Sequence, residues 1–581
     1  MKPHRERGAA LRDCRRALFL LPSLLGVLCF SVLPLLTVLF RSLFADPFCR
    51  SFTGLANYAA LLRNHAFLLA LKNTLLFLAG AVGTALPVSL LLALGLRRAL
   101  SRSGVLRSAL VLPLTMPAVT VVLLVTLFLD WQGVLNGLIR FLGLRPVNWL
   151  EGNWGRVSMI LLYLWKHCGL FALLIAAALE TVPGEEREAA QLDGAGSMRI
   201  FLAVELRHIA PVLLFVTLAG LFFGFRFFRE IVLLCGRYPS KDLYLLQHFM
   251  RNVFSLLDFQ KLCAGAVLLL LLAVPGMGLP ALLVRRFSGE GFLLPQPEIR
   301  AVRPRRFRAG DILPALLLLF YAMPTLLTLV HALAGEEELW ARYAVLYDRQ
   351  DMNPAPVRLL LWPVPPTLEG FRAFFMRRGF LRAYGRSLLY TFPALAVQLP
   401  LSLCAAWGFA GLRGRLQDGL FFLYMLLLLL PWEVTLVPSF FAARRLGILE
   451  TPWAVWLPSA FSPLPVFLFA QAFRRLPPEL REAAEVDGAG EWTVFTRIAL
   501  PNIRPTLGAA VLLSFMDLWN MVELPQTLLR EAWLMPLSVT LAALPAEGSM
   551  GPVFAASLLY LLPPLLLVPG TGLRGHREGH G

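Results

Sequence analysis

One stretch of the sequence is repeated almost half a chain further on. The first copy reads PGEEREAAQLDGAG from Pro183, and the second reads PPELREAAEVDGAG from Pro477. The glutamates of the two copies, Glu188 and Glu482, are 294 residues apart in a chain of 581. The same register continues without a gap through Phe201/Phe495, Leu206/Leu500, Ile209/Ile503 and Pro211/Pro505. A chance similarity rarely extends this far, so the sequence predicts a tandem duplication of the whole chain.

The composition places the chain in a lipid bilayer. Hydrophobic residues make up 57% of the sequence and charged residues 15%, with a mean hydropathy of +0.67, which is too apolar for a soluble fold of this length. Since a helical span needs roughly 20 apolar residues, the sequence predicts an all-α polytopic membrane protein with about 12 transmembrane helices in two tandem six-helix halves. The predicted spans are 17–43, 67–96, 105–129, 157–179, 210–225 and 262–284, then 312–334, 387–411, 419–442, 452–473, 505–519 and 551–569. The first run is too long for a signal peptide and is expected to remain as a span.

Arginine residues dominate the net charge of +18, and they cluster between the predicted spans. The clusters are Arg5 to Arg16, Arg97 to Arg107, Arg285 to Arg308, Arg413 and Arg415, and Arg574 and Arg577. With the N-terminus inside, all of them fall on the cytosolic side, which is the positive-inside pattern. A nucleic-acid surface would need a soluble basic face instead, so we expect no nucleic-acid partner. Both termini and both repeated segments are expected in the cytosol.

The duplication divides the chain into two halves joined by a linker. We expect the first half over residues 1–290, a cytosolic linker rich in arginine and proline over 291–310, and the second half over 311–581. The prolines of the linker favour an extended conformation. The longest outside segment, residues 335–386, is partly apolar, as in Leu359 to Trp362, and this predicts a packed cap on the outer face.

The sequence lacks the residue patterns of a conventional catalytic or metal site. Its seven cysteines have no CxxC spacing, and most lie in or near apolar runs, where cysteine acts as a small hydrophobic residue. The tail from His576 to His580 does not have the H-E-x-x-H order of a zinc site, and no Walker A pattern occurs. We therefore predict no enzyme activity, no metal, no cofactor and no ATPase site in this chain, so that ATP is hydrolysed by partner subunits.

The repeated segments predict short cytosolic helices that dock another protein. In the first copy, Pro183 suits a helix start and the acidic Glu185 and Glu186 favour its N-terminal turn, while Gly194 and Gly196 stop the helix. Small alanines permit close docking, and a glutamate can anchor a partner through charge-assisted hydrogen bonds. The alternative is a solvated helix that merely stays out of the membrane, but two copies in equivalent places favour docking. The docking residues are Glu188, Ala189, Ala190, Asp193 and Gly194, and Glu482, Ala483, Ala484, Asp487 and Gly488.

These segments resemble the signature loop of permease subunits in binding-protein-dependent ABC importers, in which E-A-A is followed by a glycine and then by I-x-L-P. The second copy matches throughout, at Glu482, Ala483, Ala484, Gly488, Ile498, Leu500 and Pro501. The first copy matches at Glu188, Ala189, Ala190 and Gly194, but has Val204 in place of isoleucine and Arg207 in place of proline. These departures leave the shape of its second short helix open, with Pro211 as a substitute for the missing proline.

The resemblance extends over nearly the whole chain. In the first half, residues Phe52 to Tyr58, Asn73-Thr74 and Arg226-Phe227 are similar to the first permease of maltose-type sugar importers. In the second half, Leu436-Val437-Pro438, Leu446-Gly447 and Trp519-Asn520 are similar to the second permease, although Arg386-Ser387 departs from the usual Asn-Ser. The chain thus looks like both partners fused. Asp193 and Asp487 favour the carbohydrate group, because iron, thiamine, polyamine and peptide permeases more often have L-G-A there.

The resemblance implies transport by alternating access in a bacterial or archaeal cytoplasmic membrane. An extracytoplasmic solute-binding protein would deliver a small-molecule solute, with a carbohydrate as the expected class, to a cavity between the halves. Two ATPase subunits or domains in the cytosol would grip the loops at Glu188 and Glu482.

Polar residues are costly inside a bilayer, which makes those in the predicted spans candidates for the solute pathway. These residues are Lys166, His167, Glu433, Trp519 and Asn520. A location at the membrane interface is the alternative explanation for several of them. Two alternative functions also remain at this point: a fused permease for iron, thiamine or another small solute, and a polytopic membrane enzyme, which would need convergent acids or histidines at one membrane face.

Overall fold

The computed structural model describes most of the chain, and the residues that it describes are almost entirely helical. The described ranges are 18–46, 48–102, 104–236, 238–256, 258–288, 312–346, 357–376, 378–411, 415–428, 439–440, 442–543 and 550–570. Within them, extended pairing is limited to one bridge between Phe44 and Phe52. The predicted all-α fold is confirmed. The predicted linker 291–310 lies outside the described residues, so the boundaries between the halves remain a prediction.

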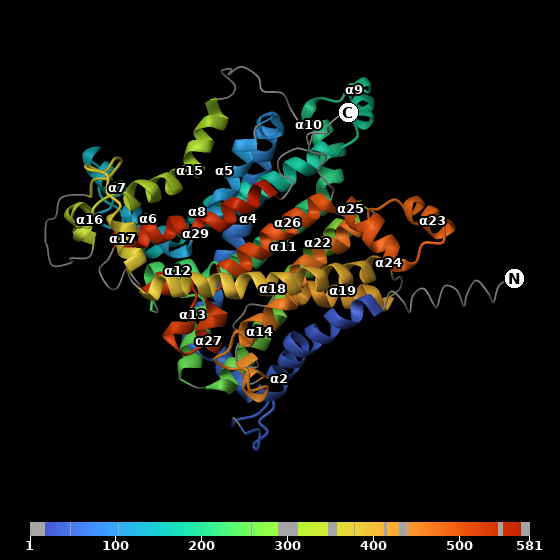
Figure 1. Ribbon diagram of the computed structural model, residues 1–581, viewed down its shortest axis with the longest axis horizontal. Helices are drawn as coiled ribbons and strands as arrows, with labels where there is room; N and C mark the ends of the chain where they lie inside the picture. Colours follow the sequence, from blue (N-terminus) through green and yellow to red (C-terminus); the bar gives the residue numbers. More distant parts are fainter. Residues whose placement is uncertain are drawn as a thin grey trace.

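Figure 1 shows the helices in chain order, with the first half in blue to green and the second half in yellow to red. The first half contains η1 (Leu28–Val32), α2 (Leu33–Arg41), α3 (Ala56–Leu62), α4 (His65–Arg102), α5 (Gly104–Thr115), α6 (Ala118–Leu129), α7 (Val134–Phe141), α8 (Gly152–Glu180), α9 (Gly184–Leu192), α10 (Ser197–Ile200), η2 (Phe201–Glu205), α11 (Leu206–Arg226), α12 (Phe228–Cys235), α13 (Leu246–Ser255) and α14 (Phe259–Ser288). The second half contains α15 (Ile312–Ala332), α16 (Glu336–Tyr343), η4 (Ala344–Leu346), α17 (Glu369–Met376), α18 (Arg378–Gly411), α19 (Arg415–Leu428), α21 (Pro452–Ala460), α22 (Pro463–Phe473), α23 (Pro478–Val486), α24 (Glu491–Thr493), η5 (Val494–Ala499), α25 (Leu500–Asn502), α26 (Arg504–Trp519), α27 (Glu523–Leu528), η6 (Ala532–Leu534), α28 (Leu537–Ala543) and α29 (Gly551–Gly570).

Eight helices among the described residues are long and apolar enough to cross a membrane, and a ninth span forms if one bent pair is counted. The eight are Leu18–Arg41, His65–Leu96, Ala118–Phe141, Gly152–Glu180, Ser197–Cys235, Pro314–Ala332, Gly379–Gly411 and Pro452–Phe473. The remaining predicted spans coincide with shorter apolar helices, as at Phe259–Leu272 and Gly551–Leu567, or run into residues outside the described ranges, as 419–442 does after α19. The multi-spanning architecture is confirmed, while the figure of twelve is not reached by length and composition alone.

One predicted span has to be corrected. The run 105–129 is not one helix, because it breaks between α5 and α6 at Met116 and Pro117. Pro117 has an extended ψ of 139° and serves as the N-cap of α6. A proline has no backbone N–H to donate to the preceding turn, so it ends one helix and starts the next. The apolar composition of the run conceals this break.

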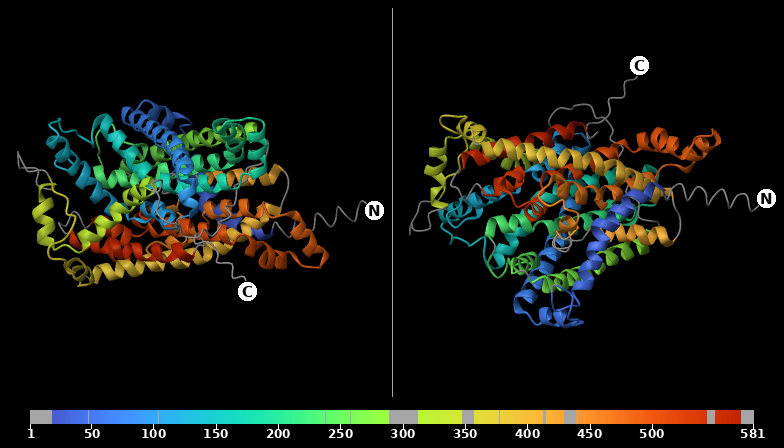
Figure 2. Two further views of the ribbon diagram at one scale, coloured as in Figure 1. Left: turned by 90° about the horizontal axis from the view of Figure 1, so that it is seen from above. Right: turned by 60° about the horizontal axis from the view of Figure 1, so that its bottom comes forward.

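The two halves exchange their outer helices reciprocally. The first span lies against the second half, where Ser23 hydrogen-bonds Tyr424 of α19 at 3.0 Å. In return, α15 and α29 pack against α5 and α6 of the first half, and Thr120 donates a hydrogen bond to Ser557. Two views of the ribbon show the blue first span lying along the orange helices of the second half (Figure 2). The halves therefore pack together, and each of the apolar clusters among the described residues contains residues from both.

The described part of the predicted outer cap is packed onto the second half. The Glu336 carboxylate in α16 accepts hydrogen bonds from the backbone N–H groups of Met550 and Gly551 at 2.8 and 2.7 Å, at the start of α29. The N–H of Val357 donates to the carbonyl of Gln132 in the first half at 3.0 Å. The cap thus joins both halves at the end of the molecule opposite the repeated segments (Figure 1).

Candidate functional site

The repeated segments form two matching short helices, α9 and α23, as the sequence predicts. Each helix ends in the same way. Gly194 and Gly488 have φ values of 76° and 78°, a left-handed conformation that favours glycine. The N–H of Ala195 donates to the carbonyl of Ala190 at 3.0 Å, and that of Ala489 to the carbonyl of Ala484 at 2.9 Å. The two glycines are needed for the turn that leads away from each helix.

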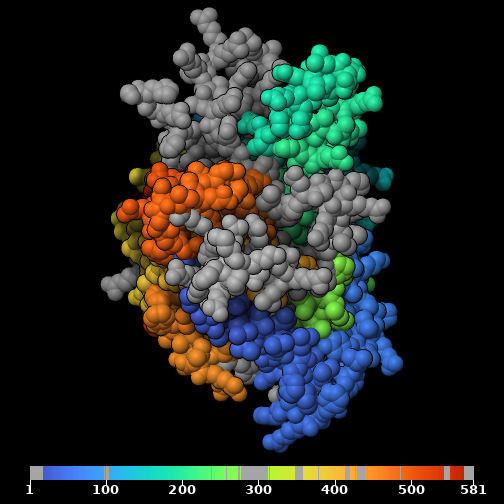
Figure 3. All heavy atoms as spheres, turned by 90° about the vertical axis from the view of Figure 1, so that its right-hand side faces the viewer, coloured from blue at the N-terminus to red at the C-terminus, as the bar shows by residue number. Residues whose placement is uncertain are grey.

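The residues predicted to dock a partner lie largely on the surface. Exposed residues in the first copy are Glu188, Ala189, Asp193 and Gly194, with Ala190 half-buried, and in the second copy they are Glu482, Ala483, Asp487 and Gly488. Ala484 differs, because its side chain is buried in the core of the second half. Figure 3 looks onto the end of the molecule that carries both segments, α9 in teal and α23 in orange. We call α9 and α23 the coupling helices.

Sequence reasoning missed an arginine that precedes the docking glutamate in both copies. Arg187 forms an ion pair with Glu205 of η2 at 2.7 Å and donates to the carbonyl of Leu179 at 2.7 Å. Its counterpart Arg481 approaches Glu491 at 3.7 Å. The signal was present, because the repeated sequence is R-E-A-A in both copies. Each arginine ties a coupling helix to the segment that follows it.

The two coupling segments continue differently into their spans. In the first half, the chain from Ser197 to Cys235 is one long helical span. In the second half, the chain bends by 83° between the helical segments Glu491–Asn502 and Thr506–Trp519, the second of which belongs to α26. Pro501 of the second copy stands where the first has Arg207, and a proline cannot continue the hydrogen bonds of a helix. The first copy keeps a single span, and Pro211 lies inside α11 without ending it.

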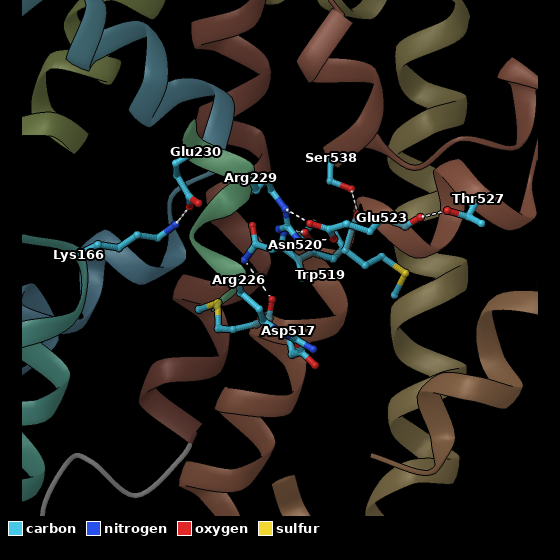
Figure 4. A network of polar contacts seen from close by, with 12 residues as sticks. Lys166, Arg226, Arg229, Glu230, Asp517, Trp519, Asn520, Glu523, Thr527 and Ser538 are labelled. Carbon is cyan, nitrogen blue, oxygen red and sulfur yellow. Dashed lines mark hydrogen bonds and ion pairs between the residues drawn. The ribbon is translucent and has the colours of Figure 1, made fainter. Parts of the chain in front are cut away.

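A network of charged residues joins the halves where the fifth spans end. Arg229 of α12 makes a two-pronged contact with Glu523 of α27, from Nε to Oε1 at 3.0 Å and from Nη2 to Oε2 at 2.6 Å. Arg229 also donates to the backbone carbonyl of Asn520. Arg226 pairs with Asp517 one turn earlier. Figure 4 shows these side chains crossing between two neighbouring helices. A two-pronged arginine–carboxylate contact is strong and fixes geometry.

The structure brings three predicted pathway residues into or beside this network. Lys166 of α8 forms an ion pair with Glu230, the neighbour of Arg229, and the two side chains are 12% and 5% exposed. Asn520 accepts a hydrogen bond from the Tyr560 hydroxyl at 3.1 Å. The Nε1 of the buried Trp519 donates to the carbonyl of Tyr560 at 3.1 Å.

The other two predicted pathway residues do not join it. His167 is buried among aromatic rings of the first half, stacked on Tyr163 at 4.4 Å and tilted against Phe223 at 4.9 Å. Its Nδ1 lies 3.0 Å from the Tyr163 carbonyl oxygen. Glu433 lies outside the described residues.

Five charged members of the network were not predicted: Arg226, Arg229, Glu230, Asp517 and Glu523. A weak signal existed, because charged residues next to long apolar runs are unusual. Four of them lie just outside the predicted spans 210–225 and 505–519, where charged residues ordinarily flank a span, and Asp517 lies near the end of the second of these spans. Arg226 and Arg229 pair with Asp517 and Glu523 of the other half, and Glu230 pairs with Lys166, which is 64 residues away in the same half, so no local pattern indicates these contacts.

Curated relatives cover this chain half at a time. The lactose transport system permease protein LacG of Rhizobium radiobacter is 30% identical over 201 residues, which is 34% of this chain and 74% of LacG. The arabinooligosaccharides transport system permease protein AraP of Bacillus subtilis is 36% identical over 218 residues, 37% of this chain and 69% of AraP. The osmoprotective compounds uptake permease protein GgtC of Synechocystis is 27% identical over 281 residues, 47% of this chain and 99% of GgtC.

A solved structure is also similar to about half of the chain. It is the crystal structure of a bacterial alginate ABC transporter in complex with an alginate pentasaccharide-bound periplasmic protein. The match has 21% identity and a TM-score of 0.42, and covers 48% of this chain and 97% of the other.

A family comparison matches both halves. The family described as "Binding-protein-dependent transport system inner membrane component" matches residues 85–289 and again 398–568. Each match includes one coupling helix and the charged end of one fifth span. Because the two matches together cover more than half of the sequence, this chain belongs to the family of inner membrane components of binding-protein-dependent transport systems, with two family domains fused in tandem.

Proposed function

We propose that this chain forms the whole membrane pathway of an ABC importer and moves a carbohydrate or a related polyhydroxylated solute into the cell. One observation carries the proposal: two matching coupling helices are exposed at one end of a molecule whose halves meet through a polar network. In a member of this transport family, partners that bind the two coupling helices at that end could move the two halves relative to each other. The chain moves solute, and partner subunits hydrolyse ATP.

The solute class is proposed from the relatives. Their names specify lactose, arabinooligosaccharides and sn-glycerol-3-phosphate. These compounds each carry two or more hydroxyl groups, which suit hydrogen bonding by arginine, carboxylate and amide side chains. The relatives therefore favour a carbohydrate over iron or thiamine, and membership of a transport family argues against a membrane enzyme.

The exposed coupling helices at one end of the molecule support a proposal for the partners. We propose one ATPase domain on each coupling helix, at Glu188 and Glu482, so that one copy of this chain serves an ATPase pair. An extracytoplasmic solute-binding protein would dock on the opposite end. Both termini and both coupling helices would then face the cytosol of a bacterial or archaeal cell.

An uptake assay tests the proposed function. Proteoliposomes would contain this chain with its ATPases inside and its binding protein outside, and would receive radiolabelled lactose, arabinooligosaccharide, glycerol-3-phosphate, thiamine or ferric iron. We expect ATP-dependent uptake of one of the first three, and vesicles without this chain serve as the control. Uptake restricted to thiamine or iron would overturn the solute class.

Two further measurements test the arrangement. Membrane-impermeant labelling of single cysteines at Ala195 and Ala489 in intact cells should leave both unlabelled until the membrane is opened. Native mass spectrometry should give one copy of this chain per two ATPase domains, and two copies per ATPase pair would contradict the fused pathway.

A further inference from the structure

Arg229 and Glu523 occupy equivalent positions in the two halves. They are 294 residues apart, which is the offset between the two coupling glutamates. The local structure agrees with this register, because α11 and α26 both stop just before these residues, with C-caps at Phe227 and Asn520. Arg229 is the second residue of the short helix α12, and Glu523 is the first residue of the short helix α27. The ion pair therefore joins a position to its own counterpart.

A contact between counterparts locates the pair on the axis that relates the halves. Two copies of one fold that exchange helices reciprocally are related by an approximate two-fold axis, in which each copy presents the same surface to the other. A residue and its counterpart can touch only where that surface crosses the axis. The direct contact at 2.6 Å therefore places the charged groups of Arg229 and Glu523 on or beside the axis.

The axis is also where a single pathway between two halves must run. In transporters built from two repeats, solute sites lie at the interface between the repeats. Arg229 and Glu523 thus lie across the line that a solute would follow. Their side chains are only 17% and 31% exposed, and Arg226 with Asp517 adds a second pair beside them.

The opposite charges make the contact possible. Identical halves would place two arginines or two glutamates against each other on the axis, and like charges would repel at that distance. The difference between the halves at this one position converts a repulsive contact into a two-pronged ion pair. Lys166, by contrast, neutralises Glu230 within the first half, so that Arg229 is available for the second half.

We infer that the Arg229–Glu523 ion pair is a seal across the translocation pathway, closed in this conformation and broken when the halves move apart to admit solute. The inference rests on the transport function proposed above. A broken pair leaves a guanidinium and a carboxylate facing the pathway. Hydrogen bonds from these two groups to the hydroxyl groups of a solute can then replace the contact between the guanidinium and the carboxylate. Breaking the pair without a solute would leave two poorly solvated charges, which disfavours opening of the empty pathway.

The seal can be tested on the chain alone, without ATPases, binding protein or a known solute. The full-length chain would be inserted into planar bilayers in potassium chloride, and ion conductance would be recorded as the probe of an open pathway. We expect the wild type to be silent. Arg229→Glu and Glu523→Arg each place like charges on the axis, so each should conduct, and the double exchange Arg229→Glu/Glu523→Arg should be silent again.

A matched control uses an ion pair away from the interface. Arg156 and Asp242 pair within the first half, with side chains 32% and 31% exposed, so Arg156→Glu disrupts an ion pair off the axis and should remain silent. Rescue by the double exchange excludes simple misfolding of the single variants. Silent single variants, or a double exchange that conducts as much as either single variant, would overturn the seal. Absence of uptake in the proteoliposome assay, with the conductance results as expected, would instead count against the proposed solute or partners.

Discussion

The ring of Phe19 stacks on the ring of Trp492, with centroids 5.9 Å apart and an interplanar angle of 23°. Phe19 lies at the start of the first span, whereas Trp492 lies in α24, directly after the second coupling helix. Phe19 also meets Phe495 edge to face at 5.6 Å. The first span of one half therefore supports the segment through which the other half would receive force.

Replacing Phe19 by alanine should weaken coupling at the second coupling helix. Each aromatic pair contributes about 0.5–1.5 kcal/mol beyond its buried area, and the substitution removes two of them. We expect ATPase stimulation by loaded binding protein to fall several-fold in proteoliposomes that contain equal amounts of inserted protein.

Phe30→Ala is the matched control. Phe30 lies on the same span and stacks on Phe461 at 5.6 Å, but this contact lies between α21 and α22, away from the coupling helix. The variant should keep nearly normal stimulation. An equal loss in both variants would show that Phe19 acts only through general stability.

The coupling glutamates should contribute unequally. Glu482 lies on α23, whose Ala484 is buried in an apolar cluster. Arg481 of the same helix lies over the Trp407 ring at 6.0 Å. These contacts hold α23 in place, and with it the surface that would dock a partner. A charge-assisted contact contributes about 1.5–3 kcal/mol. We expect Glu482→Ala to reduce uptake and ATPase stimulation more than Glu188→Ala, and unchanged uptake in both would refute the coupling role.

The left-handed glycines allow a test of the turn after each coupling helix. Gly194→Ala should destabilise the end of α9 by about 1–2 kcal/mol, because a residue with a Cβ is strained at positive φ. No atom lies within 4 Å of the added Cβ, so the cost is conformational and not a clash. Hydrogen exchange of the α9 amides should accelerate accordingly.

Gly196→Ala provides the control for this prediction. Gly196 has a φ of −70°, which any residue adopts, and its added Cβ also meets nothing within 4 Å. Exchange in α9 should stay as in the wild type. Similar acceleration in both variants would mean that the turn does not depend on the left-handed conformation.

Arg187 should hold the first coupling helix against its span. Its ion pair with Glu205 is largely buried, with side chains 24% and 10% exposed, and removal of one partner from such a contact costs about 1–3 kcal/mol. We expect Arg187→Ala to loosen α9 in hydrogen exchange and lower ATPase stimulation, whereas Arg199→Ala, at an exposed position, should change neither. Unchanged hydrogen exchange of the α9 amides in Arg187→Ala would contradict the proposal that Arg187 positions α9.

Much of the architecture could be predicted from local sequence because its causes are local. Apolar runs indicate helices in lipid, and the coupling helices have their proline, acidic turn and left-handed glycine within about ten residues. The break at Pro117 has an equally local cause, but the apolar residues around it predict one continuous span. The sequence predicts no 83° bend near Pro501; the difference between Pro501 and Arg207 only leaves the shape of the second short helix of the first copy open.

By itself, the sequence determined that the chain is a duplicated helical membrane protein and where its two coupling helices lie. Only the tertiary structure decided which charges meet. Arg229 and Glu523 each look like a flanking charge in their own segment, and Lys166 is predicted from the sequence only as a candidate for the solute pathway. Partners 294 residues apart become neighbours because the halves face each other across an axis. The sequence pattern within either half does not indicate which residues meet across that axis. The pairing is a property of the interface, where long-range contacts and the cost of unpaired charges in a low dielectric select one geometry.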